Sequence, residues 1–485
     1  MTSKKYEGFS NPIDVSTETL SCDLNQMTVS TVLGLMENEK KLPTNDINKV
    51  ESQENEKSGH NCKEPVVENL FYMALQIFVP FLIAGIGTIG AGLVLGRVED
   101  YEVFKNIKAL YILVPAIIGL KGNLDMCLAS RMCTQANLGT LDIRAELISM
   151  IIGNIFLVQV QAIVASCVVS LFAVSASAVL TGDFNFHDAM LLVASSTITA
   201  TTSCFILDFV LIAVILLTRK LKMNPDNLAT PLAASIGDVV SLIVLSTVAS
   251  LLYEIHDKYF YIMFIIVGIY VLFLLPTWVM IVRKNKYTKT VLKEGWVPVI
   301  SALFISGMGG LVLDSAVEDF TGFVVFQPII NGIGGNLVSI QSSRISTMLH
   351  QTSLPGIIPP YTKQWIMPWA TFFSKMLSAR TARLLVILSI PGQVVFVLVA
   401  DVIYNNGELA STVYFVLTYL TVFIFQLSIL LYVCHLLIHT MWRFKIDPDN
   451  SAIPFLTALG DLLGTCLLFA GFIFLKEIGH PYTPI

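Results

Sequence analysis

Long apolar segments with few charges alternate with short polar connections along the chain after residue 68. Several of these segments exceed about 18 residues, the length with which an α-helix crosses a bilayer, whereas barrel strands would show alternating segments of ~10 residues. The pattern therefore predicts an all-α polytopic membrane protein with about 11 transmembrane helices. The expected spans are roughly 70–95, 109–128, 146–180, 189–217, 229–253, 259–282, 296–314, 322–343, 384–402, 410–440 and 452–475.

The composition agrees with this class of protein. Hydrophobic residues make up 54% of the 485 residues and charged residues 13%, against about 25% charged in an ordinary soluble domain. A soluble enzyme, a disordered chain and a collagen-like fibre are therefore excluded. The 8 cysteines are scattered without a CxxC pair, which favours buried small side chains over a metal or disulfide framework.

The net charge of −5 belongs to the amino-terminal segment, because residues 1–68 hold 12 Asp and Glu and 7 Lys. Such a segment buries too little apolar surface to offset its ordering entropy, so residues 1–66 are expected to form a disordered acidic cytosolic tail. The tail has neither the apolar stretch of a signal peptide nor the Arg-rich character of a mitochondrial presequence. These features favour the plasma membrane, with the mitochondrial inner membrane or an endomembrane as the alternative.

The charges of the connections predict the orientation in the membrane. With the amino terminus inside, 17 Lys and Arg fall in inner connections and 5 in outer ones, as the positive-inside rule requires. The connection after the first span fits least well, because it places 3 basic residues outside. The amino terminus is therefore expected in the cytosol and residues 479–485 outside, which needs an odd number of spans.

Two sequence blocks occur twice along the chain. The block that begins at Pro115 recurs from Pro328, with 9 of 20 positions identical at an offset of 213 residues. The block that ends at Gly237-Asp238 recurs as the block that ends at Asp461, with 7 of 15 positions identical at an offset of 223. Most of the shared residues are Gly, Asn, Pro and Asp and few are Leu or Ile, so the match indicates a duplication.

Residues 67–256 and 291–478 are therefore predicted to be two repeats of five helices each. Five spans alone would invert the second repeat, but the sixth span, within residues 257–290, restores the orientation of the first. Parallel repeats are related by an axis along the membrane normal. The chain is expected to be a monomeric pseudo-dimer whose transport pathway lies between the repeats.

Asp238 and Asp461 lie well inside the fifth span of each repeat. A carboxylate at such a depth costs at least ~2.5–3.5 kcal/mol on insertion scales, and it persists only if it is paired, protonated or facing water. At equivalent positions the two side chains would face each other across the pseudo-twofold axis, and hard cations such as Mg²⁺ prefer oxygen ligands. We interpret the pair as a site for a divalent cation; the alternative is an Asp that caps a helix or pairs with a buried Lys.

A Pro-Asp-Asn motif precedes each fifth span on the inner side. It contains Asp226 and Asn227 in the first repeat and Asp449 and Asn450 in the second. These residues either cap the helix or form an acidic ring at the cytosolic mouth, and the two interpretations are compatible.

Glycine and asparagine also recur in the second span of each repeat. Gly122-Asn123 and Gly335-Asn336 are expected to break the helix, with tight helix packing as the alternative. The asparagine side chain would then reach a neighbouring helix or the pathway.

The repeats differ at several charged positions. Lys121 and Asp125 lie four residues apart in the first repeat only, so they are candidates to pair with each other. Asp208 in the fourth span has no evident partner and is, with Asp125, a candidate accessory site for a cation or a proton; an interhelical hydrogen bond is the alternative for Asp208. His435 and His439 are interpreted as interface residues, because no carboxylate stands at HExxH spacing.

The duplicated blocks resemble the integral-membrane domain of MgtE-type magnesium transporters, and the fused double form resembles eukaryotic solute carrier family 41. The resemblance covers about residues 67–478. It implies Mg²⁺ transport through a pore lined by the two fifth helices, with Asp238 and Asp461 as pore aspartates. The neighbouring pore positions are Thr230 and Ala234 in the first repeat and Ile453 and Thr457 in the second.

The resemblance also implies Mg²⁺ efflux, with Na⁺ as the candidate coupling ion. Mg²⁺ is then the substrate, no cofactor is expected, and the partners are divalent cations and the lipid bilayer but not nucleic acid. The cytosolic acidic and CBS domains of the bacterial proteins do not fit into the amino-terminal tail, so their gating mechanism is expected to be absent.

Two other classes of protein share some of these features. An intramembrane aspartyl protease also uses two membrane aspartates near Gly-x-Gly-Asp, but the segments that end at Asp238 and Asp461 lack the first glycine. A non-transporting receptor or scaffold would need an ordered extramembrane domain, and the sequence shows none. The chain is therefore expected not to be an enzyme.

Overall fold

The computed structural model describes residues 70–137, 144–182, 184–220, 225–255, 258–446 and 448–484. Inside the helices some side chains are not described, among them those of residues 225–235 and 449–450. All of the described residues belong to one compact unit, Val67–Ile485. The predicted tail, residues 1–66, lies outside the described residues.

Eleven helices in the described ranges are long and apolar enough to cross a membrane, which confirms the predicted class and number of spans. Those of the first repeat are α3 (Leu70–Val98), α5 (Ala109–Asn137), α6 (Arg144–Thr181), α7 (Phe186–Lys220) and α8 (Pro225–Ile255). Those of the second repeat are α12 (Trp296–Asp319), α13 (Phe323–Thr352), α15 (Leu377–Tyr404), α16 (Val413–Arg443) and α17 (Pro448–Glu477). Three short helices connect them: α4 (Glu102–Asn106), α11 (Val291–Glu294) and α14 (Ala370–Phe373).

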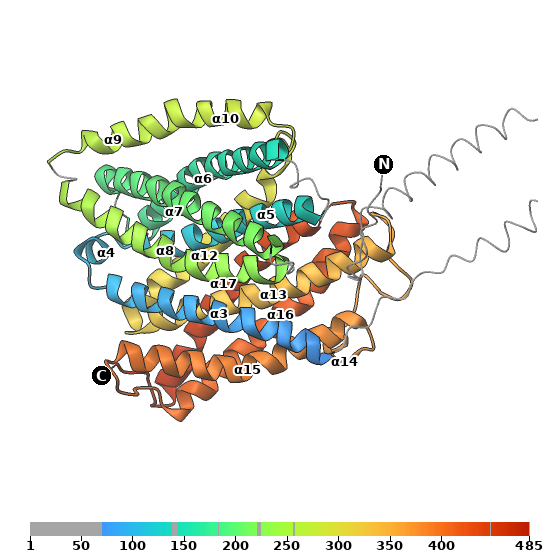
Figure 1. The fold of residues 1–485 in the computed structure, drawn as a ribbon. Coiled ribbons are helices and arrows are strands. Elements are labelled where there is room, and N and C mark those ends of the chain that lie inside the picture. The colour runs from blue at the N-terminus through green and yellow to red at the C-terminus, as the bar shows by residue number, and fades with distance from the viewer. Residues whose placement is uncertain are drawn as a thin grey trace, which may run out of the picture. The chain divides into compact units, whose positions relative to one another are not determined.

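The sixth span stands apart from the other ten. It consists of α9 (Tyr261–Gly268), a π-helical segment η2 (Ile269–Leu274) and α10 (Leu275–Lys284). Only 6% of this span is buried, and it packs against α6 and α7 (Figure 1). The π-helical segment ends two residues before Pro276, whose ring and missing N–H disturb α-helical hydrogen bonding. The sixth span is thus a connection between the repeats and not part of their shared core.

The first helix of each repeat packs against the other repeat. Helix α3 lies against α13 and α15, and α12 lies against α5 and α6 (Figure 1). A Cβ at Gly92 would lie 2.1 Å from the carbonyl oxygen of Val325, and a Cβ at Gly310 would lie 2.2 Å from that of Ile112. Small residues allow close approach of helix backbones in membranes. Both crossings therefore depend on a glycine, at equivalent places in the two repeats.

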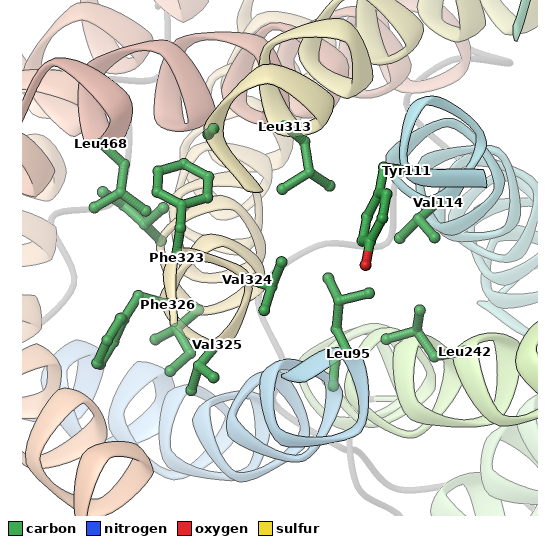
Figure 2. Packing of buried hydrophobic residues seen from close by; sticks show 14 of the residues in the cluster. Leu95, Tyr111, Val114, Leu242, Leu313, Phe323, Val324, Val325, Phe326 and Leu468 are labelled. Atoms are coloured by element: carbon green, nitrogen blue, oxygen red, sulfur yellow. The ribbon is translucent and has the colours of Figure 1, made fainter. Parts of the chain in front are cut away.

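Side chains of both repeats meet in one apolar core. Figure 2 shows Leu95 of α3, Tyr111 of α5, Leu242 of α8, Leu313 of α12 and Phe326 of α13 around this core. All five side chains are buried. Because helices of both repeats enclose the core, their packing fixes the relative positions of α5, α8, α13 and α17.

The second helix of each repeat is continuous. Helices α5 and α13 run through Gly122-Asn123 and Gly335-Asn336 without a break, so the prediction of broken helices is wrong. Gly335 instead allows close packing, because a Cβ at Gly460 of α17 would lie 3.7 Å from its backbone nitrogen, whereas a Cβ at Gly122 would have nothing within 4 Å. Glycine inside a helix costs roughly 0.5–1 kcal/mol relative to alanine, and the close approach of the helices offsets this cost.

Candidate functional site

A cavity of about 70 Å³ lies where α5, α8, α13 and α17 meet. Asp238 of α8 and Asp461 of α17 both line it, so the structure brings together two carboxylates from separate repeats. The other lining residues are Pro115, Ile118, Gly119, Gly122, Asn123, Met126, Gln327, Pro328, Asn331, Gly332, Gly335, Asn336 and Thr457.

The lining of the cavity is largely two-fold symmetric. Five pairs of residues at the offsets of 213 and 223 face it from the two repeats. The pairs are Pro115 and Pro328, Gly119 and Gly332, Gly122 and Gly335, Asn123 and Asn336, and Asp238 and Asp461. The second repeat adds two amides, because Gln327 and Asn331 stand at the positions of Val114 and Ile118.

Each aspartate lies close to a glycine of the other repeat. A Cβ at Gly119 of α5 would lie 3.1 Å from Oδ2 of Asp461, and a Cβ at Gly332 of α13 would lie 3.8 Å from Oδ2 of Asp238. The absence of side chains at these glycines leaves space beside both carboxylates. The charge of Asp238 also acts on Asp461, so two ionised carboxylates would repel each other here without a cation near them.

Hydroxyl groups on the two first helices stand beside the aspartates. The hydroxyl of Ser306 on α12 donates a hydrogen bond to Oδ2 of Asp461 at 2.9 Å. Thr88 of α3 occupies the corresponding place next to Gly332, but its hydroxyl donates to the backbone oxygen of Gly85 at 3.0 Å. The symmetric pair of aspartates therefore has asymmetric hydrogen bonding.

Further polar side chains hold one another around the cavity. The Thr457 hydroxyl donates to Oδ1 of Asn123 at 2.8 Å, which joins α17 of one repeat to α5 of the other. The hydroxyl of Thr465 accepts hydrogen bonds from the amides of Gln327 at 3.1 Å and Asn331 at 2.9 Å. These bonds orient the amide and hydroxyl groups before any ion arrives.

The remaining predicted pore and mouth positions do not contribute described side chains to the cavity. Ile453 is partly buried on α17 and is not among the described residues that line the cavity. The other positions have helical backbones, but their side chains lie outside the described part of the structure: Thr230, Ala234, Asp226, Asn227, Asp449 and Asn450. Their roles stay predictions.

The predicted ion pair of the first repeat is present. Nζ of Lys121 lies 3.1 Å from Oδ2 of Asp125, and both residues are buried. Asp208 on α7 is buried as well, and neither of its carboxylate oxygens has a hydrogen-bond partner among the described side chains. None of these three residues lines the cavity.

The two histidines of α16 hold the connection between α13 and α15. Nε2 of His435 lies 2.9 Å from the carbonyl oxygen of Lys363, and Nε2 of His439 lies 2.7 Å from the hydroxyl of Thr362. Both rings are engaged by this connection, so we assign them a structural role. The described cysteines are free and lie buried or partly buried in the helices.

The donor groups of the cavity suit a cation that keeps part of its water. Within the described ranges no group of three or more His, Cys, Asp and Glu could hold a metal ion. Direct ligands would therefore be the two carboxylates together with amide and hydroxyl oxygens. Mg²⁺ keeps several waters and usually binds through one or two carboxylates, so this arrangement fits a hydrated divalent cation.

Sequence reasoning missed Ser306, Thr88, Gln327 and Asn331. A lone hydroxyl or amide in an apolar span carries no signal by itself, because such groups often bond only to their own helix. A signal did exist in the first helices: each of the two hydroxyl residues stands four positions before the glycine at which its helix crosses the other repeat.

A duplicated bundle of membrane-spanning helices with two carboxylates in a cavity between the repeats defines a polytopic cation transporter. The sequence profile of the MgtE family, described as a divalent cation transporter, matches residues 114–248 and 327–471. One match falls within each predicted repeat.

Curated relatives agree with the family match. Solute carrier family 41 member 2 of Homo sapiens is 44% identical over 409 residues, 84% of this chain and 71% of the relative. Member 2 of Xenopus laevis is 44% identical over 419 residues, 86% of this chain and 74% of the relative. Member 3 of Rattus norvegicus is 39% identical over 409 residues, 84% of this chain and 88% of the relative.

The chain therefore belongs to the MgtE family of divalent cation transporters and, within it, to solute carrier family 41. These relatives are transporters and not enzymes, which argues against the alternative of an aspartyl protease. No solved structure matches the chain.

Proposed function

We propose that this protein transports Mg²⁺ across the membrane along a pathway between its two repeats, with Asp238 and Asp461 as the paired site. The observation that carries this proposal is the cavity to which each repeat contributes an equivalent carboxylate. The family match and the names of the relatives support transport of divalent cations. Mg²⁺ is favoured among divalent cations because it keeps several of its waters and therefore needs few protein ligands, such as two carboxylates and a few amide oxygens.

The charge of the site favours a divalent over a monovalent cation. Two unit charges 4 Å apart interact by about 4 kcal/mol at an effective dielectric constant of ~20. A divalent cation near both carboxylates gains about twice the attraction of a monovalent one from each of them. Because the aspartates also repel each other, the ion that relieves this repulsion most is bound best.

We further propose that the protein exports Mg²⁺ from the cytosol across the plasma membrane, with a cytosolic amino terminus. An inside-negative potential opposes this export by about 2.3 kcal/mol per charge for each 100 mV. Export therefore needs a coupled cation, for which family resemblance suggests Na⁺. A single chain suffices, because both halves of the site come from the two repeats of one molecule.

Transport into vesicles tests the proposed function. The full-length protein is purified and reconstituted into liposomes that contain a Mg²⁺-sensitive dye, and Mg²⁺ is added outside. The dye signal should rise faster than in protein-free liposomes and should saturate with Mg²⁺ concentration. Asp319→Asn, a change at an exposed carboxylate at the end of α12, should behave like the wild type. Signals equal to those of protein-free liposomes, with insertion verified by flotation, would contradict the proposal.

A further inference from the structure

A second group of buried charges lies in the first repeat only. Lys121 and Asp125 of α5 form an ion pair, and Asp208 of α7 is 0% exposed. At the offset of 213, the second repeat has Gly334 and Val338 in the places of Lys121 and Asp125. A pathway between two equivalent halves does not need charges in one half alone, so this group requires its own explanation.

The carboxyl group of Asp208 lacks a hydrogen-bond partner at both oxygens among the described side chains. An isolated ionised carboxylate is far more costly in such surroundings than the neutral acid. Acidic residues inside membrane helices therefore carry a proton or pair with a cation. Arg131 acts on Asp208, but its Nε donates to Oδ1 of Asn154 at 2.7 Å and not to Asp208. The described part of the chain also holds no cluster of three or more His, Cys, Asp and Glu for a metal ion, so a proton is the cation that suits Asp208.

The charged groups that act on Asp208 most strongly come from α5. They are Asp125, then Arg131 and then Lys121. The thiol of Cys204 lies one helical turn before Asp208 on α7, and the charge of Asp208 acts on it. Among the described side chains, α6, α8 and α9 supply no charge that acts on Asp208 as strongly. The charge on Asp208 thus depends first on its burial and then on these charged groups of α5.

The same ion pair reaches the cation site. A Cβ at Gly237 would lie 1.0 Å from Nζ of Lys121, so the ammonium group occupies the space that a side chain would fill next to Asp238. The charge of Lys121 acts on Asp238. In the second repeat the neutral amide of Gln426 stands at the corresponding place and donates to the carbonyl oxygen of Gly460 at 3.0 Å. Among the described side chains, only those of the first repeat therefore connect the cation site to a buried acid.

We propose that Asp208 is a proton-binding site, coupled through Asp125 and Lys121 to the paired aspartates, and that the protein exchanges Mg²⁺ for protons in place of the Na⁺ that family resemblance suggests. This inference rests on the proposed Mg²⁺ transport. When Mg²⁺ brings two positive charges to the aspartates, the O–H bond of the Asp208 carboxyl group breaks and the proton passes to water. When Mg²⁺ leaves, a proton from water restores that bond.

The exchange has a defined balance of charge and direction. One Mg²⁺ moves one way and one proton moves the other way, so each cycle transfers one net positive charge. Coupling between two binding sites is reciprocal. A proton gradient should therefore drive Mg²⁺ through the protein even when the Mg²⁺ concentrations on the two sides are equal.

Liposomes with equal Mg²⁺ on both sides and a Mg²⁺-sensitive dye inside test this inference. The potential is clamped with K⁺ and valinomycin, and a pH gradient or a Na⁺ gradient is then imposed. For the wild type we expect net Mg²⁺ movement with the pH gradient. Asp208→Asn has the shape of the neutral acid and cannot release a proton, so its pH-driven movement should fall at least about tenfold, within the usual range of coupling effects. Asp208→Glu should restore part of it, and Asp319→Asn should match the wild type.

The possible outcomes separate this inference from the proposed function. Downhill Mg²⁺ flux without any pH-driven movement in the wild type would overturn proton exchange and leave Mg²⁺ transport standing. If the pH gradient still drives Mg²⁺ movement in Asp208→Asn, the assignment of Asp208 is overturned. Absence of downhill flux in the wild type would remove the proposed function itself. Melting temperatures measured in parallel identify a variant that fails to fold. If Asp208→Asn fails to fold, Asp208→Glu decides: a folded Asp208→Glu variant without pH-driven Mg²⁺ movement contradicts the proposal.

Discussion

A single hydroxyl group distinguishes the surroundings of the two aspartates. Ser306 donates a hydrogen bond to Asp461, whereas Thr88 in the corresponding place donates to its own helix. A hydrogen bond to a charged group contributes on the order of 1.5–3 kcal/mol. Asp461 should therefore hold its negative charge more readily with Ser306 present.

Removal of the Ser306 hydroxyl should weaken cation binding. We predict that Ser306→Ala raises the Mg²⁺ concentration for half-maximal flux about tenfold, which corresponds to about 1.4 kcal/mol. Thr88→Val is the matched control in the other repeat, and it should change this concentration much less. Flux into liposomes over a range of Mg²⁺ concentrations measures both. Equal shifts in the two variants would show that the hydrogen bond to Asp461 is not the reason.

The aspartates could be predicted from the sequence, and their hydroxyl neighbours could not. Asp238 and Asp461 stand out because a charged residue is rare in an apolar span and because it occurs twice at one offset. Ser306 is compatible with an apolar span and is therefore inconspicuous. Its role follows only from the crossing of α12 with the other repeat, which is a property of the packed structure.

At the scale of helices, the two glycine crossings decide how the repeats fit together. A Cβ at Gly92 or Gly310 would stand 2.1 Å or 2.2 Å from a carbonyl oxygen of the helix it crosses. Backbone atoms cannot move aside as a flexible side chain can, so the helices themselves would have to separate.

Gly92→Val and Gly310→Val should each destabilise the protein by about 1–3 kcal/mol or more through overpacking. Thermal unfolding in detergent measures this loss of stability as a lower melting temperature. The fraction of protein that stays monodisperse serves as the signal. Gly268→Ala is the control, because a Cβ at Gly268 would have nothing within 4 Å. If the Gly92 and Gly310 variants melt like the Gly268 variant, the close crossings described above are incorrect.

The connection between α13 and α15 is a second feature at the scale of helices. It consists of residues 353–376, and the imidazoles of α16 contact it at Lys363 and Thr362. Nε1 of Trp442 also donates to the carbonyl oxygen of Ile357 at 3.0 Å. We predict that His439→Ala makes the connection more sensitive to limited proteolysis and leaves Mg²⁺ flux near that of the wild type. Unchanged proteolysis, or a loss of flux at a normal melting temperature, would contradict the structural role of His439.

The hydrophobic pattern predicted the eleven spans, but it could not show how their glycines are used. Gly122 and Gly335 suggested broken helices, because glycine is a poor helix former in isolation. In the structure α5 and α13 stay helical. Helix α17 packs against Gly335, whereas a Cβ at Gly122 would have nothing within 4 Å. Tertiary packing of this kind is decided by partners more than 100 residues away and leaves no local pattern.

At the scale of the whole molecule, the repeats are joined by reciprocal packing of their first helices and by the sixth span. If all eleven of the long apolar helices cross the membrane, the two chain ends lie on opposite sides of it. We predict that a tag at the amino terminus is protected inside intact cells and that a tag at the carboxyl terminus is accessible from outside. Antibody labelling before and after permeabilisation measures this. Termini on the same side would remove the sixth span as a crossing, and parallel repeats with it.

The central claim is that one cation site is shared by both repeats, and charge removal at its two aspartates tests it most directly. Asp238→Asn, Asp461→Asn and the double variant are compared with Asp319→Asn for Mg²⁺ flux into liposomes at equal amounts of folded protein. Either single change should abolish most of the flux, and the double variant should be little worse than the poorer single, because residues that act as one unit are not additive. Wild-type flux in the double variant would contradict the account.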